Sequence, residues 1–265
     1  MGIDKKRFDF LINVFKIQEP LAKSTRLPLI GKLANTGVNR KTMQLTYVPI
    51  NQDIEVPPGI SAPLSLIEHF INRASHHVIL KKCPCRTVLN CESHERNFGC
   101  TFIGEGAREI SADLGDHVTK EEAIKHLHDA ADAGLISLIG KFNADAVALN
   151  VKQKSRLMTI CHCCECCCVS KSVHYAAKPF RELIVKLEGI ELEVTDACEG
   201  CAECVTACVF NQIKIVGGKA TIGEECKGCG RCADACPHGA INIKVTDPSY
   251  IDAYTERISS ILKIN

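Results

Sequence analysis

Cysteine is the residue type that could carry most of the chemistry in this chain, which has 18 cysteines among 265 residues. Two runs near the C-terminus share the spacing C-x₂-C-x₂-C-x₃-C, and Pro237 closes the second run. The runs comprise Cys198, Cys201, Cys204 and Cys208, then Cys226, Cys229, Cys232 and Cys236. Such clustered thiols in a reducing compartment are typical metal ligands, so a disulfide scaffold is the weaker interpretation.

This stretch resembles the bacterial-type ferredoxins that bind two [4Fe–4S] clusters, over about the last quarter of the chain. In that family each cluster takes three ligands from one run and the fourth from the other run. The resemblance implies one cluster on Cys198, Cys201, Cys204 and Cys236, and another on Cys226, Cys229, Cys232 and Cys208. Val209 stands where proline is more usual, which changes the turn but removes no ligand. Zinc is the weaker alternative at these cysteines.

A further cysteine group lies upstream, with the spacing C-x-C-x₅-C-x₈-C, and comprises Cys83, Cys85, Cys91 and Cys100. Four thiolates at this spacing can enclose one metal ion or one [4Fe–4S] cluster. Structural zinc sites usually contain two C-x₂-C pairs, so the pattern favours an additional Fe–S cluster, with zinc or a redox-active thiol set as alternatives. Arg86 would stabilise thiolates here, whereas Lys81 and Lys82 are equally well explained as solvated charges.

Six more cysteines crowd into residues 161–168, and these are Cys161, Cys163, Cys164, Cys166, Cys167 and Cys168. In an extended segment they would alternate between two faces, with Cys161, Cys163 and Cys167 together. A helix would instead bring together Cys161, Cys164, Cys167 and Cys168. Because neither arrangement lets all six reach one cube, we expect either a strip between two metal centres or one larger, non-cubane cluster shared with the first upstream group.

At least two of the ten upstream thiols would then be spare or bridging, and redox or substrate chemistry could occur there. The alternative that several are only buried or redundant stays open. His162 and Glu165, which lie inside the run, could ligate an iron or move protons.

The C-P-C-R motif, the C-H-C-C-x-C-C-C run and the ferredoxin-like end together resemble a group of Fe–S proteins of anaerobic bacteria and archaea. That resemblance implies no particular activity, but it implies that the two upstream groups belong to one site.

Hydrophobic periodicity, together with the ferredoxin fold that the resemblance implies for the C-terminal part, predicts an α+β chain with three parts. Residues 1–187 form a mixed, cysteine-rich domain with a winged-helix-like unit at about 110–150, residues 188–247 form a ferredoxin-like (βαβ)₂ domain, and residues 248–265 form a helix that packs on the body. In the first part we expect an amphipathic docking helix that carries Phe8, Leu11, Ile12 and Phe15. A hairpin follows at 44–50 and 53–56, and then a helix from Pro63 to about His77, capped by Ser61.

The winged-helix-like unit is predicted from a capping box of Thr119 and Glu122, a helix that ends at Gly134, a strand at 135–139 and a return strand at 142–149. Its helix is acidic, which counts against DNA recognition, and His126 and His128 are expected on the surface. Farther on we expect a helix at 180–187, paired strands at 190–194 and 241–245, and a hairpin at 213–216 and 219–222.

Composition narrows the function classes. The formal net charge of +1 gives no general attraction to nucleic acid or anionic membranes. There is no apolar run of about 20 residues, no signal-peptide pattern and no complete dinucleotide-binding fingerprint around Gly104 and Gly106, so we expect a cytoplasmic protein without its own nicotinamide or flavin site.

The leading function is therefore electron transfer between the ferredoxin clusters and an additional Fe–S centre or a redox partner protein. One alternative is a reductase that acts on a small-molecule substrate at an unusual cluster. A second alternative is a redox-sensing DNA-binding regulator, which the neutral charge disfavours. The sequence leaves the oligomeric state open and permits a homodimer.

Overall fold

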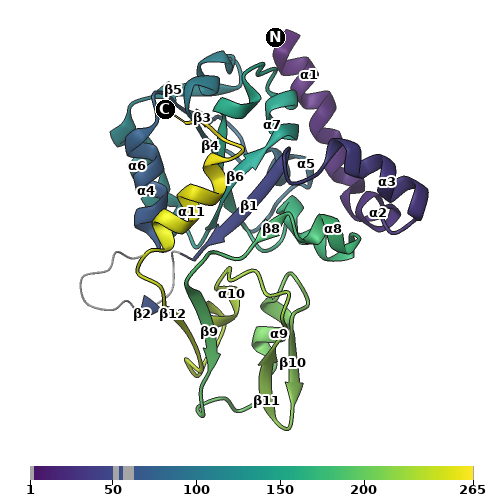
Figure 1. The fold of residues 1–265 in the computed structure, drawn as a ribbon, viewed down its shortest axis with the longest axis vertical. Coiled ribbons are helices and arrows are strands. Elements are labelled where there is room, and N and C mark those ends of the chain that lie inside the picture. The colour runs from purple at the N-terminus through teal and green to yellow at the C-terminus, as the bar shows by residue number, and fades with distance from the viewer. Residues whose placement is uncertain (1–2, 50–53, 56–62, 265) are drawn as a thin grey trace.

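A seven-stranded sheet forms the centre of the larger body, which occupies the upper part of Figure 1. The computed structural model describes residues 3–49, 54–55 and 63–264. The strand order is β5-β3-β4-β7-β6-β1-β8, with every neighbouring pair antiparallel except β1 and β8. The bounds are β1 (Met43–Val48), β3 (His77–Leu80), β4 (Thr101–Ile103), β5 (Gly115–Val118), β6 (Ile136–Phe142), β7 (Met158–Cys163) and β8 (Ile184–Val185). Because β7 is the middle strand, its end carries Cys161 and Cys163 into the interior.

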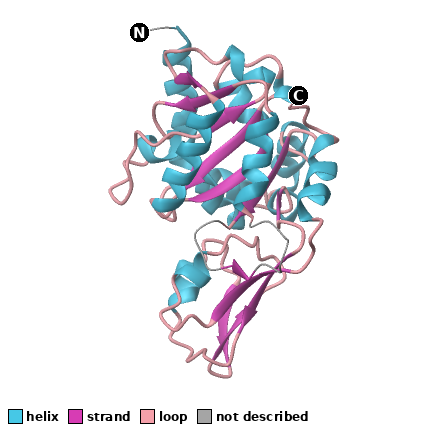
Figure 2. Cartoon of the chain, turned by 90° about the vertical axis from the view of Figure 1, so that its left-hand side faces the viewer, coloured by secondary structure: helices cyan, strands magenta, loops and turns pink. Residues whose placement is uncertain are grey.

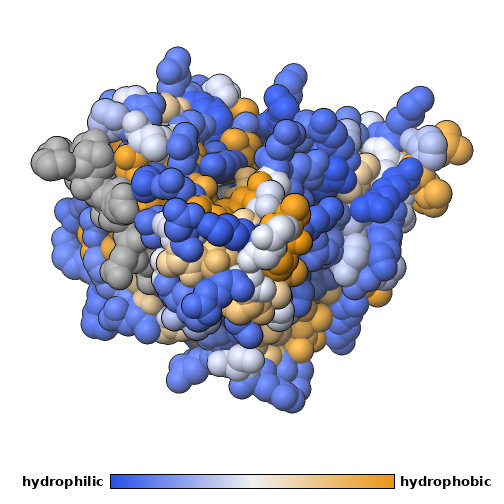
Figure 3. All heavy atoms as spheres, turned by 90° about the horizontal axis from the view of Figure 1, so that it is seen from below, coloured by the Kyte–Doolittle hydropathy of each residue, from blue (hydrophilic) through white to orange (hydrophobic). Residues whose placement is uncertain are grey.

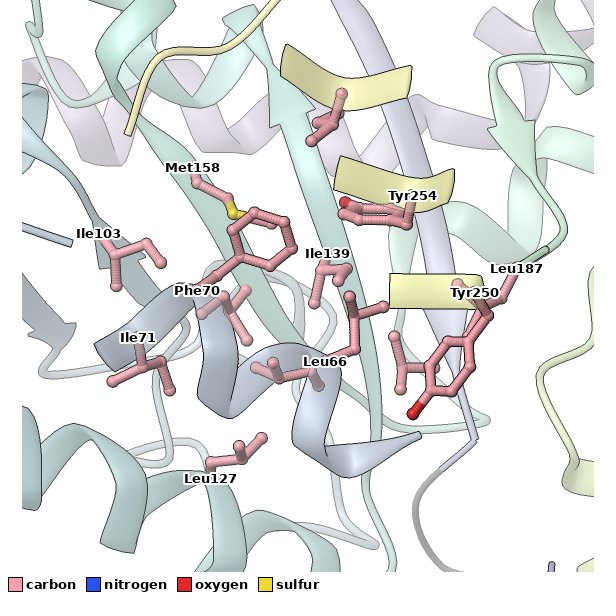
Figure 4. Packing of buried hydrophobic residues seen from close by; sticks show 14 of the residues in the cluster. Leu66, Phe70, Ile71, Ile103, Leu127, Ile139, Met158, Leu187, Tyr250 and Tyr254 are labelled. Atoms are coloured by element: carbon pink, nitrogen blue, oxygen red, sulfur yellow. The ribbon is translucent and has the colours of Figure 1, made fainter. Parts of the chain in front are cut away.

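Helices cover both faces of this sheet (Figure 2). Phe102 and Ile103 are neighbours on β4 but belong to different buried clusters, as expected for side chains that alternate between the faces of a strand. The cluster around Ile103, part of which is drawn in Figure 4, includes residues of three α-helices, and the cluster around Phe102 includes residues of two α-helices and one 3₁₀-helix. The α-helices are α4 (Leu64–Arg73), α6 (Lys120–Asp132) and α11 (Tyr250–Ser259) on the first face, and α1 (Ile3–Ile12) and α7 (Asn143–Ala148) on the second.

The N-terminal helix docks on the body, as its amphipathic pattern predicts. Phe8 and Ile12 are buried in the cluster around Phe102, whereas Phe10 is 78% exposed. The chain continues through η1 (Asn13–Ile17), α2 (Gln18–Ser24) and α3 (Pro28–Gly37). Among the described residues, no helix combines the length and the apolar character that crossing a membrane requires.

The hairpin predicted for residues 44–56 is wrong, although both strands exist. β1 pairs with β6 and β8, whereas β2 (Ile54–Glu55) joins the smaller lobe, which is built from residues 190–245, and runs parallel to β12 (Ile241–Val245). The helix after it is confirmed as α4, which buries Leu66, Ile67, Phe70 and Ile71. It ends at Arg73, earlier than predicted, and His77 begins β3. The predicted cap, Ser61, lies outside the described residues.

The return strand predicted for residues 142–149 is also wrong, because this Ala-rich segment forms the helix α7. The capping box of Thr119 and Glu122 is confirmed at the start of α6, and Gly134 follows its end with a φ of +72°. The strand after it, β6, pairs with β1 and β7 and lies inside the large sheet. Residues 110–150 therefore lack the wing of a winged-helix unit, and the DNA-binding hypothesis loses its structural basis.

The smaller lobe lies below the body in Figure 1 and has the predicted strand pairing. β9 (Ile190–Val194) pairs with β12 along its whole length, from Ile190 opposite Val245 to Val194 opposite Ile241. The predicted hairpin is β10 (Ile213–Val216) with β11 (Lys219–Ile222). Seen from the lobe side, hydrophilic residues surround a more apolar centre (Figure 3).

Short helices complete the chain. The helix predicted at 180–187 is only partly formed, because it ends at Arg181 and β8 follows it. The C-terminal helix α11 packs against α4, with Phe70 and Tyr254 in edge-to-face contact. The remaining elements are α5 (Pro84–Val88), η2 (Glu105–Glu109), η3 (Lys154–Arg156), η4 (Val169–Tyr175), α8 (Lys178–Arg181), α9 (Glu203–Ala207) and α10 (Arg231–Asp234).

Candidate metal centres

The eight cysteines of the lobe line two separate cavities. The first, which we call the outer cavity, is lined by three cysteines of the first run and one of the second: Cys198, Cys201, Cys204 and Cys236. The second, the inner cavity, is lined by Cys226, Cys229, Cys232 and Cys208. The structure thus groups these thiols as the ferredoxin resemblance implies, because the chain crosses over between the two cavities.

The lobe backbone turns toward the sulfur atoms of these cysteines. N–H groups of Ala220 and Ala240 each donate to a cysteine sulfur of the outer cavity, Cys198 and Cys236, at 3.3 Å. Those of Gln212 and Gly228 donate to Cys208 and Cys226 of the inner cavity at 3.2 and 3.4 Å. Such donors stabilise negative charge on sulfur, and those of Ala220 and Gly200 lower the pKa of Cys198. Four thiols facing one cavity, with N–H groups aimed at them, fit a [4Fe–4S] cluster.

Four of the upstream cysteines form a compact group, which we call the turn group: Cys91, Cys164, Cys166 and Cys167. Their sulfur atoms all lie within 4.8 Å of one another, and those of Cys91 and Cys166 are 3.4 Å apart. The extended arrangement predicted for 161–168 holds only for 161–163, at the end of β7, and the helical arrangement is wrong. The chain leaves β7 after Cys163 and turns through 165–167. This turn brings three sulfurs of the run to one point.

Four others form a second set, the sheet group: Cys83, Cys85, Cys100 and Cys161. The thiol of Cys83 contacts those of Cys85 and Cys100, and these contacts hold its pKa well below the usual range. Cys100 in turn contacts Cys161, because the antiparallel pairing of β4 with β7 places Thr101 opposite Ile160. The upstream cysteines therefore gather in two places, and each place takes cysteines from both motifs. The prediction that the first motif alone surrounds one centre is wrong, because Cys91 lies with the second motif.

Cys163 and Cys168 make the remaining pair. Their sulfur atoms are 3.0 Å apart and both side chains are buried. Contacts with Cys163 and Ser170 hold the pKa of Cys168 at about 6 although burial opposes this, whereas contact with Cys168 and burial raise the pKa of Cys163. The hydroxyl of Ser170 lies 2.9 Å from the Cys168 sulfur and also hydrogen-bonds to Tyr47.

Arg86 is a buried cation, 1% exposed, that lies between the turn group and the sheet group. Its guanidinium donates to the carbonyl oxygens of Glu95, Phe98 and His162. Burial acts to lower its pKa, but Cys83 and Cys164 on either side raise it. The neighbouring lysines are exposed, and Lys81 pairs with Asp116, as expected for a solvated charge.

Among the three histidines that the sequence singled out, His162 and His126 differ from expectation, whereas His128 agrees with it. His162 faces away from Cys161 and Cys163 on β7, and its two ring nitrogens contact the hydroxyls of Thr101 and Ser137, so it is not placed as a ligand. Its burial lowers its pKa well below the usual range. His126 was expected on the surface but stacks on Phe98, with ring centroids 4.1 Å apart. His128 is exposed and pairs with Glu68.

Arg231 of the lobe connects the inner cavity with the upstream cysteines, and sequence reasoning missed it. It lines the inner cavity, donates to the carbonyl oxygen of Cys163 at 2.7 Å and lies 3.5 Å from the carboxylate of Glu165. Glu165 also contacts His94 at 3.1 Å. The Nε of Arg231 is buried and has no hydrogen-bond partner among the described residues, which fits an anionic cluster in the adjacent cavity. The sequence signal that could have identified Arg231 is its position between two cysteines of the second run, in the motif C-G-R-C.

Residues 222–242 match the family model of a 4Fe–4S binding domain. This stretch contains the second cysteine run and all of α10. No curated protein and no solved structure matches the chain. Together with the cysteine groups, the matched domain supports an iron–sulfur protein with an electron-transfer role.

Proposed function

We propose that this protein carries low-potential electrons between two [4Fe–4S] clusters in the lobe and two further Fe–S centres in the body. The lobe clusters would be held by the cysteines of the outer and inner cavities, and the body centres by the turn group and the sheet group. A bound cluster supplies one-electron exchange without breaking protein bonds. The observation that carries the proposal is the contact of Arg231 with Cys163, because it joins the inner cavity to the cysteine run of the body.

The burial of the cysteines gives the route a direction. Cys201 is the exposed cysteine of the outer cavity, which makes this cavity the contact point for an external carrier. Cys208 and Cys229 of the inner cavity pack in the same apolar cluster as Cys163 and Cys168. Electrons would thus enter at the outer cavity and pass through the inner cavity to the body.

The chain's own residues prepare this route for added negative charge. Arg86 and Arg231 are buried cations beside cysteines, and each would stabilise the reduced form of a neighbouring centre. Tyr47 and Phe210 make edge-to-face contact at 5.6 Å between body and lobe, and with their neighbours they exclude water from the junction. Low polarity strengthens the influence of both arginines, since buried charges are poorly screened.

A cleft beside the inner cavity is a candidate docking place for the redox partner. It is lined by the cationic residues Arg26, Arg181 and Lys227 and by the aromatic residues Tyr175 and Phe210. Glu225 neutralises Arg181 through two hydrogen bonds of 2.8 Å, which leaves Arg26 and Lys227 for an acidic partner. This composition supports an acidic electron-carrier protein as the partner.

A reductase is the second candidate, and one observation favours it. The turn group and the sheet group use eight of the upstream thiols and leave Cys163 and Cys168, so thiols that need not bind metal lie beside both centres. Consumption of a small oxidised substrate by the reduced protein, without any partner protein, would distinguish a reductase from a carrier.

Iron and acid-labile sulfide counts on anaerobically purified protein, combined with EPR, test the proposal. We expect clearly more than about eight irons per chain, which is the content of two [4Fe–4S] clusters. A value near eight, with EPR signals from the lobe alone, would contradict the body centres.

A further inference from the structure

The sulfur atoms of Cys163 and Cys168 form a closely spaced, buried pair of thiols outside the turn group. Four of the other upstream cysteines form the turn group, and four more are linked through Cys83 and Cys100, whereas the sulfur atoms of Cys163 and Cys168 lie 3.0 Å from each other. A disulfide has a sulfur–sulfur distance of about 2.0 Å, so a shift of about 1 Å would close it. The pair lies at the two ends of one turn, and such a short loop keeps its ends together.

The surroundings isolate this pair from outside thiols. Cys163 and Cys168 are 4% and 7% exposed, and Tyr47, Phe210 and Leu183 belong to the same apolar cluster. An external disulfide cannot reach the sulfurs for exchange, which needs an in-line approach to one sulfur atom. Electrons can nevertheless arrive, because Cys229 of the inner cavity packs in this cluster and Arg231 holds the carbonyl group of Cys163.

The geometry points to an internal redox-active dithiol: Cys163 and Cys168 interconvert with a disulfide and store two electrons between the lobe and the body. Oxidation removes the protons that the two sulfur atoms still carry, forms one S–S bond, and sends two electrons, one at a time, to the neighbouring Fe–S centres. Reduction by low-potential electrons that enter through the lobe breaks the S–S bond and returns those protons. This inference rests on the proposed function, because the lobe clusters are the source and acceptor of these electrons.

The hydrogen bonds around the pair provide a first path for the protons. Cys168 contacts the hydroxyl of Ser170 at 2.9 Å, and Ser170 hydrogen-bonds to the hydroxyl of Tyr47. Cys163 contacts Cys168, so a proton on either sulfur atom can leave through the same chain of hydroxyls. The pair would let a protein whose clusters exchange single electrons deliver them two at a time.

The test is thiol mapping on the holoprotein. Protein is poised anaerobically with redox mediators at a series of potentials, quenched in acid, alkylated and mapped by mass spectrometry. At oxidising potentials we expect every cysteine to be alkylated except Cys163 and Cys168, which remain joined. Their disulfide-to-dithiol ratio should change tenfold for about 30 mV, as a two-electron couple requires. Ser172→Ala is the control for changes in the same buried segment, because Ser172 donates to the carbonyl oxygen of Val169 and not to either sulfur atom. Its disulfide-to-dithiol ratio at each potential should equal that of wild type.

Three outcomes separate this inference from the proposed function. If Cys163 and Cys168 are alkylated at every potential while iron content and EPR signals are normal, the dithiol is refuted and electron transfer stands. If Cys163→Ser and Cys168→Ser each lose the iron of a whole cluster, the two residues are ligands and the dithiol is again refuted. An iron count near eight with an intact two-electron couple would instead refute the body centres. Cys201→Ser, which should lose lobe iron, must retain the disulfide in oxidised samples.

Discussion

Arg231 donates a hydrogen bond to the carbonyl oxygen of Cys163 across the boundary between lobe and body. The two residues are far apart in the sequence, and each lies next to thiols of a different candidate centre. Arg231 stands between Cys229 and Cys232, and Cys163 stands beside the turn group. This contact holds the lobe against the body, so the proposed route for electrons would pass beside one buried cation.

We expect Arg231→Met to slow electron delivery from the lobe to the body. The substitution removes a charge-assisted hydrogen bond, which contributes roughly 1.5–3 kcal/mol to stability, and a charge that favours reduction nearby. Rapid-freeze EPR after mixing with a low-potential reductant should show the body signals appearing later than in wild type. Arg40→Met is the matched control, because Arg40 is exposed and only approaches Glu182 at 3.5 Å. Equal rates in all three proteins would contradict the route.

Arg86→Met should destabilise the body more than any exposed arginine variant. The carbonyl oxygens of Glu95, Phe98 and His162 would lose their donor inside the protein, at a cost of roughly 3 kcal/mol or more. Thermal unfolding of the anaerobic holoprotein measures this loss. Arg108→Met, at an exposed arginine, should stay within about 0.5 kcal/mol of wild type. If Arg86→Met loses no more stability than Arg108→Met, the three hydrogen bonds of Arg86 contribute little to the stability of the body.

Cys164→Ser and Cys83→Ser should remove different EPR signals. Cys164 belongs to the turn group and Cys83 to the sheet group, and Arg86 separates the two. Each variant should lose the iron of one centre and retain the other. If both variants change the same single feature, the ten upstream cysteines hold one larger cluster, as the sequence also allowed.

The strand pairs and the cysteine groups of the lobe could be predicted from the sequence, whereas the position of β2, the role of Arg231 and the cysteine groups of the body could not. In the lobe, ligand spacing and strand patterns are local, so the pairing of Ile190 with Val245 follows from short segments. The turn group joins Cys91 to Cys166 over 75 positions, and no local period encodes that contact. The return strand predicted for residues 142–149 is wrong for the same reason. The strand that it was expected to pair with, β6, pairs instead with the distant strands β1 and β7, so residues 143–148 form the helix that their composition favours.

Ala202→Gly should stabilise the lobe. Ala202 has a left-handed backbone with a φ of +69°, at the position before α9 that Gly230 occupies before α10 with a φ of +85°. Left-handed geometry costs a non-glycine residue roughly 1–2 kcal/mol, which exceeds the greater chain entropy that glycine loses on folding. We expect a gain of about 0.5–1 kcal/mol in thermal unfolding, and a loss of about 1 kcal/mol for Gly230→Ala. A lower melting temperature for Ala202→Gly would contradict this account.

Asp145 should make the stability of the body fall with rising pH. Burial raises the pKa of its carboxyl group to about 7, although a hydrogen bond from Thr159 at 2.8 Å opposes the shift. The unfolded chain has the ordinary pKa near 3.8, so between these two values the folded state holds the proton more tightly. The protonated carboxyl group of Asp145 therefore contributes to the free energy of unfolding. This contribution is complete below about pH 4 and is lost as the pH rises through 7, with a total of roughly 2–4 kcal/mol.

Melting temperatures of the anaerobic holoprotein at pH 6 and pH 8 measure this effect. Wild type should be less stable at pH 8, and Asp145→Asn should be more stable than wild type at pH 8 with a smaller difference between the two pH values. The amide oxygen can still accept the hydrogen bond of Thr159, so the substitution removes the charge and preserves the contact. Asp116→Asn, at an exposed carboxylate, should retain the wild-type pH dependence. An unchanged pH dependence in Asp145→Asn would show that another group controls stability in this range.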